Sequence, residues 1–560
     1  MIDALPPGLI LILGALLIPA TRGLVRQGWV LVLPLLTLWA IWSVPDGVQT
    51  TLPFFGYMLE PVEGSVVGRL FATVFTIMTL IGGLYAVNQA RAVELAGAFG
   101  YAGSAVGVTF AGDLITMFVF WEIMAIGSTV VIWAAGTASA YAASMRYALV
   151  HIFGGVVLMV GVVGHIAETG SIDFVAMQAD SLARWLILIG FLVNAGAPPF
   201  SAWLPDAYPE ASPSGTVFLS AYTTKTAVFT LLVGFPGEQI LIWVGLYMAL
   251  YGIIYALLEN DMRRILAYSI VNQVGFMVCG IGIGTEMALN GAASHAFAHI
   301  IYKALLLMSA GSVLMMTGKR KCTELGGLFQ SMPVTALCGI VGALAISSFP
   351  FTSGFVSKSM INQSAADLHL TFVWMMLTAA SAGVFLHAGI KFPWFVFFQK
   401  DSGMRPPDPP LNMKLAMYVF AALCILLGVW TDPLYAILPY PVDYVPYTGD
   451  HLVSQFQLLL FAGLAFFVML PMMKRTETIS LDLDWFYRRF FKAIGTEFTV
   501  RAGDHRQELE QAALARLGRF VEGLYRHHGP QGILARTWPT GSTVLWVAIL
   551  LGVYVVIYYI

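Results

Sequence analysis

Residues 294–305 read Ser294-His-Ala-Phe-Ala-His-Ile-Ile-Tyr-Lys-Ala-Leu305, in the middle of a long apolar run. His295, His299 and Lys303 are spaced four residues apart, which places them in one stripe on a helix. A charged group at the centre of a bilayer-spanning helix costs roughly 2.5–3.5 kcal/mol on insertion scales, so such groups normally face an internal polar pathway. The stretch therefore predicts a membrane helix whose inner face carries protons or ions.

The composition of the whole chain is that of a membrane protein. Of its 560 residues, 58% are hydrophobic and 11% are charged, and the mean hydropathy is +0.79, whereas soluble domains carry about 25% charged residues. About 20 apolar residues span the hydrocarbon core, and these runs do not alternate as the strands of a membrane barrel do. We predict an all-α polytopic membrane protein with about sixteen transmembrane helices. Their centres lie near residues 14, 36, 77, 102, 124, 156, 191, 225, 248, 273, 303, 345, 383, 420, 464 and 549.

The distribution of basic residues predicts the orientation. Of the 29 lysines and arginines, four lie within predicted spans, and 23 of the other 25 fall in loops that follow odd-numbered helices. Positive loops mark the cytoplasmic face, so both termini are expected on the external side of a plasma membrane. The chain begins Met-Ile-Asp with no basic region before its apolar run, so no cleavable signal peptide is expected.

Other ionisable residues within the spans have both a transport and a structural interpretation. Glu122, Lys225 and Lys358 extend the set of candidate path residues, although Glu122 could instead be the structural partner of one lysine. Lys391 stands late in its helix and could extend its charged end to the inner surface. His151 could be a packed or water-bound histidine or an additional path residue.

The sequence gives little support for a metal or cofactor. His295 and His299 could bind zinc, but no glutamate stands between them in an H-E-x-x-H pattern and no third ligand is evident. The four cysteines are scattered without a C-x-x-C pair, and the glycines of residues 280–284 follow no strand, as a dinucleotide fold would require. We expect no metal, cluster or cofactor, and no nucleic-acid partner.

Two predicted spans are visibly broken. Asn194-Ala-Gly-Ala-Pro-Pro-Phe-Ser-Ala-Trp203 interrupts the seventh, and Ser347-Ser-Phe-Pro-Phe-Thr-Ser-Gly-Phe-Val-Ser-Lys358 interrupts the twelfth. Proline removes a hydrogen-bond donor and clashes with the preceding turn, and free carbonyls at membrane depth are tolerated only within protein or beside water. The two breaks stand five helices apart and share a Pro-Phe-Ser/Thr core, which indicates duplicated five-helix units; proline kinks also occur for purely structural reasons.

The chain is therefore divided into six segments. They are N-terminal helices over 1–110, with the fourth helix beginning repeat one, a first repeat over 93–235, a second repeat over 238–398, two helices over 411–473, a polar and amphipathic segment over 474–539, and a last anchor helix over 540–560.

Five motifs occur in order over some 240 residues. They are Phe120-Trp-Glu-Ile-Met124, Trp203-Leu-Pro-Asp-Ala-Tyr208, Asn260-Asp-Met-Arg-Arg-Ile-Leu-Ala-Tyr268, Ser294 to Leu305 as quoted above, and Gly354-Phe-Val-Ser-Lys358. Over roughly residues 65–430 the chain closely resembles the antiporter-like subunits of respiratory complex I and the D-type subunit of Mrp cation/proton antiporters. The resemblance implies a proton-conducting subunit with two inverted five-helix repeats joined by a central polar axis.

The resemblance also implies residue roles. Glu122 matches the carboxylate of helix five, Lys225 the lysine of helix eight and Lys358 the lysine of broken helix twelve, while the stripe from His295 to Lys303 matches the relay of helix eleven.

One position departs from the family pattern. The family usually has a lysine where this chain has Asn194 on broken helix seven, and asparagine cannot hold a proton at neutral pH. The usual ion pair of the first half-channel is therefore absent, and we expect Glu122 to pair with Lys225 instead. Since burial disfavours a charged lysine and a carboxylate favours it, opening and closing that pair could load and release a proton.

Three functions follow from these patterns. The first is a proton-translocating subunit of a multisubunit Mrp-like Na⁺/proton antiporter, with other membrane subunits, protons, Na⁺ and membrane lipid as its partners. The second is the pumping arm of a complex I-like or hydrogenase-like redox complex. The third is the membrane subunit that energises an inorganic carbon uptake complex. In each of them the chain is a transporter subunit rather than the enzyme itself.

Overall fold

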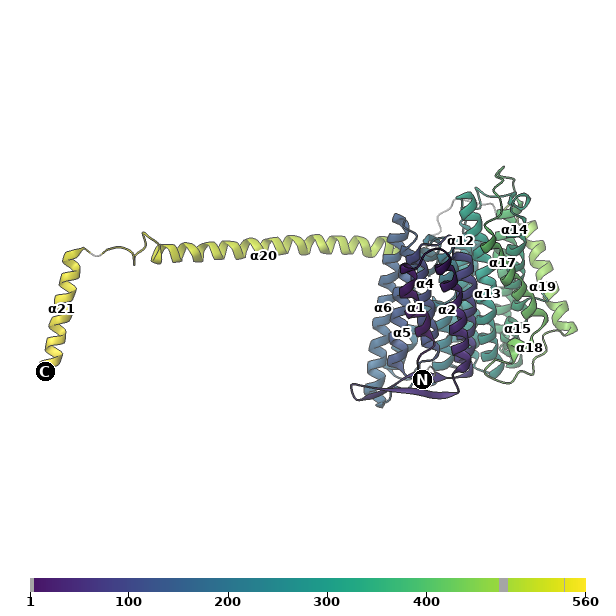
Figure 1. Ribbon diagram of the computed structural model, residues 1–560, viewed down its shortest axis with the longest axis horizontal. Helices are drawn as coiled ribbons and strands as arrows, with labels where there is room; N and C mark the ends of the chain where they lie inside the picture. The colour runs from purple at the N-terminus through teal and green to yellow at the C-terminus, as the bar shows by residue number, and fades with distance from the viewer. Residues whose placement is uncertain (1–4, 473–481, 538) are drawn as a thin grey trace. The chain divides into compact units, whose positions relative to one another are not determined.

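A computed structural model describes residues 5–472, 482–537 and 539–560 of the chain (Figure 1). The first four residues, for which no signal peptide was expected, lie outside the described residues. So do residues 474–481 of the predicted polar segment. The chain forms two compact units, Met1–Asp484 and Trp485–Ile560, which are described separately.

The predicted all-α membrane class is confirmed. Twelve of the described helices are long and apolar enough to cross a membrane, and three shorter apolar helices accompany them. Each of the sixteen predicted centres lies within a helix, but the number sixteen itself stays a prediction. Figure 1 shows these helices of the first unit packed side by side as one bundle.

The bundle is built from four groups of helices. The first comprises α1 (Gly8–Leu17), η2 (Ile18–Ala20), α2 (Gly23–Ser43) and α3 (Val66–Ala86). The second comprises α4 (Ala92–Thr109), α5 (Leu114–Trp133), α6 (Ala138–Thr169), α7 (Leu182–Ala195), α8 (Trp203–Ala207), η3 (Tyr208–Glu210), α9 (Gly215–Leu219) and α10 (Thr223–Gly234). The third comprises α11 (Ile240–Leu258), α12 (Met262–Ile283), α13 (Glu286–Thr317), η4 (Leu328–Gln330), α14 (Pro333–Ile346), α15 (Ser353–Asp367), α16 (Thr371–Val384), and the π-helices η5 (Phe385–Lys391) and η6 (Trp394–Phe398). The fourth comprises α17 (Leu411–Val429), α18 (Asp432–Tyr435) and α19 (Gly449–Val468).

The second and third groups repeat one another residue by residue over much of their length. Helices α6 and α13 each have 32 residues, and adding 148 to a residue number takes the N-cap Thr137 to the N-cap Thr285 and the left-handed C-cap Gly170 to Gly318. The same shift takes the helix-capping Asp113 to Asp261. The expectation that the two repeats are inverted relative to one another in the bilayer stays a prediction. The domain boundaries drawn from the sequence stay predictions.

The two breaks have the same place in the two sets. Helices α7 and α14 each have 14 residues and end directly before a break. The first break contains a cis peptide bond between Pro198 and Pro199, and α8 follows it. The second leads into α15, which begins at Ser353. Both interruptions predicted from the sequence therefore lie between consecutive helices of the structure, the first between α7 and α8 and the second between α14 and α15.

A β-hairpin was not expected from the sequence. Strands β1 (Gly47–Phe54) and β2 (Tyr57–Gly64) pair antiparallel and lie across one end of the bundle (Figure 1). The hairpin packs against the start of α5, because Asp113 accepts a hydrogen bond from the backbone N–H of Glu60 at 2.7 Å. Its Glu63 lies near Asp173, and burial together with this negative charge raises the pKa of the Glu63 carboxyl above its usual 4.5.

The first unit ends in a buried carboxylate. Asp482 is 6% exposed and accepts hydrogen bonds at 2.7 Å from the hydroxyls of Tyr251 on α11 and Tyr268 on α12. Because both donors lie on the bundle, they fasten the chain shortly before the second unit begins at Trp485.

The second unit consists of η7 (Phe486–Phe490), the 38-residue helix α20 (Phe491–His528) and α21 (Thr540–Tyr559). Leu514, Leu517, Val521 and Leu524, which predicted an amphipathic helix, lie on α20. Helix α21 is the predicted final apolar helix.

Candidate functional site

Helix α13 carries the predicted stripe through the middle of the bundle. His295, His299 and Lys303 are all fully buried, and the two imidazole centroids are 6.3 Å apart. Successive members are one helical turn apart, so the structure brings all three together on one face. These three side chains form the centre of the candidate site.

Neutral polar groups surround the two ends of this stripe. The ammonium of Lys303 donates to the Ser269 hydroxyl at 2.9 Å. The ring of His295 contacts Ser357 Oγ at 3.1 Å through Nδ1 and Gln273 Oε1 at 3.0 Å through Nε2. Helices α12 and α15 therefore supply the lining on either side of α13.

The centre of the stripe is held differently. Neither ring nitrogen of His299 has a hydrogen-bond partner among the described residues, and the ring lies 5.2 Å, centroid to centroid, from Tyr302. Because a neutral imidazole has one donor and one acceptor, both functions of His299 are free to exchange a proton with a neighbour. It is the least constrained member of the stripe.

A break between two short helices places Lys225. Helix α9 ends at Leu219 and α10 starts at Thr223, and the ammonium of Lys225 donates to Ser220 O at 2.6 Å and to Thr224 Oγ1 at 3.0 Å. The side chain is fully buried. Carbonyls freed at membrane depth need a donor, and here a lysine supplies it.

The second broken helix places Lys358 in the same manner. Its ammonium donates to the carbonyl of Ile346, the last residue of α14, at 3.1 Å, and lies 4.9 Å from the centroid of the Phe276 ring. A cation is favoured both at a helix C-terminus and over an aromatic face. The break predicted from Pro350 thus builds the site of the lysine eight residues later.

The expected pair of Glu122 with Lys225 is not formed. No ion pair within the described part of the chain joins them, because Lys225 is satisfied by its own helix break. Glu122 instead lies against α6, where a β-carbon on Gly155 would collide with its carboxylate. Its Oε1 is buried and has no hydrogen-bond partner among the described residues.

Asn194 and His151 contact each other. Asn194 is the next-to-last residue of α7, and its Oδ1 lies 2.7 Å from Nδ1 of His151 on α6. Both side chains are almost completely buried. The position that departs from the family pattern therefore contacts a titratable side chain from the neighbouring helix.

Lys391 contacts the C-terminal end of helix α11. Its ammonium donates to the carbonyls of Ala256, Leu257 and Glu259 at 3.1, 2.6 and 2.6 Å, at the end of α11. It therefore caps that helix, and its side chain is buried rather than extended into water.

The sequence analysis missed several residues of the site. Gln273, Ser269 and Ser357 are uncharged, and only their position inside apolar runs could have pointed to them. His387 is a third fully buried histidine of the second repeat, four residues before Lys391 on the π-helix η5. A π-helical turn often marks a functional region.

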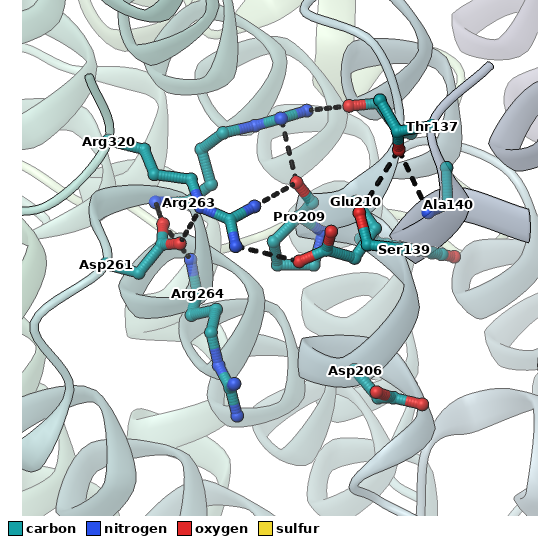
Figure 2. Close-up of polar contacts among 12 residues, drawn as sticks. Thr137, Ser139, Ala140, Asp206, Pro209, Glu210, Asp261, Arg263, Arg264 and Arg320 are labelled. Carbon is teal, nitrogen blue, oxygen red and sulfur yellow. Dashed lines mark hydrogen bonds and ion pairs between the residues drawn. The ribbon is translucent and has the colours of Figure 1, made fainter. Parts of the chain in front are cut away.

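A charged cluster joins the two repeats at the end of the bundle predicted to be cytoplasmic (Figure 2). Arg320 pairs with Glu210 at 2.9 Å and with Asp261 at 2.8 Å. Arg263, at the start of α12, donates to the carbonyls of Pro209 and Ala211. The segment that follows the first break is thereby fixed to the start of the second repeat.

The pKa values of the two carboxylates in this cluster are shifted in opposite directions. Burial is the largest influence on the pKa of the Glu210 carboxyl and would raise it, but the charge of Arg320, the hydrogen bonds from Ser139 and Arg320 and the charge of Arg263 together hold the pKa below its usual value. Burial dominates at Asp261 and raises its pKa in spite of Arg320. Arg320 is therefore the main counter-charge of Glu210.

The pattern of the site is matched by a known family model. The model described as NADH:quinone oxidoreductase/Mrp antiporter, transmembrane, covers residues 111–383. This range holds Glu122, Lys225, the stripe on α13, and Lys358. Over these 273 residues the chain matches the family of antiporter-like membrane subunits.

Curated relatives of this antiporter-like protein are named for different functions. It is 29% identical over 351 residues to the D-type Na(+)/H(+) antiporter subunit of Alkalihalophilus pseudofirmus, covering 59% of this chain and 71% of that protein. It is 26% identical to "Hydrogenase-4 component B" of Escherichia coli, covering 64% of this chain and 61% of that protein. It is 29% identical to the A/B-type subunit of a probable K(+)/H(+) antiporter of Rhizobium meliloti, but spans only 39% of that protein's length.

Two solved complexes share the fold. A chain of the Mrp complex from Dietzia is 20% identical with a TM-score of 0.66, and the match covers 82% of the antiporter-like chain and 95% of the Dietzia chain. A chain of the membrane-bound sulfane sulfur reductase, an archaeal respiratory membrane complex, is 23% identical with a TM-score of 0.72, and the match covers 98% of the antiporter-like chain and 99% of the reductase chain.

Proposed function

We propose that this chain is the proton-translocating membrane subunit of a multisubunit, Mrp-like Na⁺/proton antiporter of the plasma membrane. Protons would pass along the buried groups of α10, α13 and α15, and Na⁺ exchange would depend on companion membrane subunits. The likeness to the D-type antiporter subunit of Alkalihalophilus pseudofirmus supports the choice of antiport.

The observation that carries the proposal is the type of partner that the buried lysines have. Lys225, Lys303 and Lys358 donate only to carbonyl and hydroxyl oxygens, and none of them belongs to an ion pair within the described residues. A nearby carboxylate would favour the charged form of a lysine. Neutral acceptors leave each lysine able to lose its proton to the next group, which a relay requires.

A cleft supports release on the side predicted to be external. It has a volume of about 1300 Å³ and lies beside α15, α16 and α19. Ser359, Asn362, Glu286 and Asp443 are among the residues that line it. Since Ser359 directly follows Lys358, a proton leaving that lysine would have a short path to water.

A second candidate function is the pumping arm of a redox complex. The match to the archaeal reductase complex extends over 98% of this chain and so includes the second unit, whereas the match to the Mrp complex covers 82%. The shared long α20 favours assembly with a neighbouring subunit of that kind.

One experiment separates the two candidates. The full chain carrying an affinity tag would be purified from its own membranes, and its companions identified by mass spectrometry. Small antiporter subunits, together with Na⁺-dependent proton movement in everted vesicles without any redox substrate, are expected. Companions that bind iron–sulfur clusters, with proton movement only during electron transfer, would support the redox arm and contradict the antiporter.

A further inference from the structure

The first repeat has its own histidine at the position of the relay histidine of the second. Adding 148 to the residue number takes His151 on α6 to His299 on α13, and Tyr147 to His295. The two helices have the same length and equivalent caps, so these positions lie at the same depth within their repeats. The structure therefore places an imidazole at the centre of each long helix.

The surroundings of His151 fix its orientation. The side chain is 2% exposed, and its ring contacts the rings of Tyr147, 4.0 Å away, and Trp203, 4.7 Å away, measured between centroids. Nδ1 is 2.7 Å from Asn194 Oδ1. Because that oxygen can only accept, the proton of the neutral ring stands on Nδ1.

This tautomer leaves the other ring nitrogen as a base. Nε2 of His151 is buried and has no hydrogen-bond partner among the described residues. The groups that can titrate around it are Tyr147 on its own helix and Tyr208, whose ring is 6.4 Å from that of Tyr147. Glu122 of α5 lies against Gly155, which is one turn further along α6 than His151. No ion pair engages His151 within the described residues, so the ring can gain and lose a proton at Nε2.

Several hydroxyl groups lie in the region between this histidine and Lys225. The Tyr147 hydroxyl is 3.3 Å from Thr223 Oγ1, which is 2.5 Å from the hydroxyl of Tyr101. Thr223 is followed by Thr224, whose hydroxyl accepts from the ammonium of Lys225 at 3.0 Å. Tyr147 thus contacts both the ring of His151 and Thr223, the first residue of the helix that carries Lys225.

We propose that His151 is the proton-carrying residue of the first repeat and that Asn194 is its positioning residue. This inference rests on the proposed function and adds to it the group that takes the proton where broken helix α7 has an asparagine, Asn194, in place of a titratable residue. Protonation at Nε2 gives an imidazolium that donates from both nitrogens, and release of the same proton restores the neutral ring.

The test compares three variants of the full chain in its complex. His151→Gln keeps a hydrogen-bonding side chain but cannot titrate near neutral pH. Asn194→Ala removes only the partner of Nδ1. His165→Gln is the matched control, because His165 is another buried histidine of α6 and belongs to no part of the proposed path. Proton uptake into everted vesicles is measured from pH 5 to 8, the range in which an imidazole titrates, and normalised to the assembled complex.

We expect His151→Gln to lower proton uptake at least tenfold, Asn194→Ala to lower it several-fold and shift its pH profile, and His165→Gln to leave both unchanged. His151→Gln with the wild-type rate and pH profile would overturn the proposal. If His151→Gln does not assemble, an unchanged pH profile in Asn194→Ala overturns it instead. Lys225→Ala and Lys358→Ala are measured alongside: normal uptake in both would contradict the proposed function, whereas loss in both with normal uptake in His151→Gln contradicts only the role of His151.

Discussion

Replacing Gln273 by glutamate should trap a proton on the relay. Gln273 Oε1 lies 3.0 Å from His295 Nε2 and accepts from the Tyr302 hydroxyl at 3.0 Å. Gln273→Glu retains an acceptor of the same size at this place but adds a negative charge. The protonated form of His295 gains a direct counter-charge, and the proton leaves more slowly.

The size of the effect follows from the distance. At 3.0 Å and an effective dielectric constant of about 20, the gross attraction between unit charges is about 5–6 kcal/mol. Burying the new carboxylate takes back several kcal/mol. A net gain of about 1.4–2.8 kcal/mol slows proton release by about 10–100-fold.

The assay is proton uptake into everted vesicles, normalised to the amount of assembled complex. Gln273→Leu is the matched control, because it removes the same hydrogen bonds without adding charge. Its cost is limited, since the Tyr302 hydroxyl is already 3.3 Å from His295 Nε2 and the two can pair; we expect about 1–3 kcal/mol of lost stability and a smaller loss of transport. Wild-type uptake in an assembled Gln273→Glu variant would refute the position of His295 on the path.

Three further predictions concern stability and orientation. Arg320→Ala should lower stability by about 1–3 kcal/mol, because the buried carboxylate of Asp261 loses an ion pair at 2.8 Å; an unchanged thermal midpoint of the purified complex would contradict this. Since the folded chain raises the pKa of Glu63 above 4.5, its charge destabilises the fold above the unfolded pKa and not below it. Glu63→Gln should therefore raise the thermal midpoint at pH 7.5 and not at pH 4, and a gain that is equal at both values would rule out the charge as its cause. A reporter fused near residue 505 should be cytoplasmic and one after Ile560 external; the opposite result would contradict the predicted topology.

Sequence periodicity and turn chemistry were sufficient for the helices and the breaks. The spacing of His295, His299 and Lys303 fixed one face of one helix, and no tertiary information was needed to bring them together. The proline at residue 350 likewise located the end of α14. Each of these features is determined by residues that lie close together in the sequence.

The contacts between helices could not be predicted in the same way. The partner of Glu122 depends on how closely α5 approaches α6, which the small size of Gly155 decides. The carbonyl of Ser220 satisfies Lys225 only because the chain breaks between α9 and α10. Both are consequences of three-dimensional packing, and the spacing of charged residues does not encode them.

The two broken spans already indicated an internal repeat in the sequence, but the structure was needed to show which residues of the two repeats correspond. The shift of 148 residues that takes Thr137 to Thr285 and Gly170 to Gly318 also takes His151 to His299. The structure gives this shift its meaning, because it shows both histidines on helices of equal length with equivalent caps. The first repeat is thereby provided with a titratable group in spite of Asn194.

The central claim is that protons cross through the buried lysines, and Lys358→Ala tests it most directly. Lys358 is 2% exposed and its ammonium has only the Ile346 carbonyl and the Phe276 ring as partners among the described residues, so its removal breaks no ion pair. Proton uptake is measured in everted vesicles that contain equal amounts of assembled complex, with the exposed Lys319→Ala as control. The account predicts that Lys358→Ala abolishes uptake while Lys319→Ala retains it; uptake by Lys358→Ala at the control rate would contradict the account.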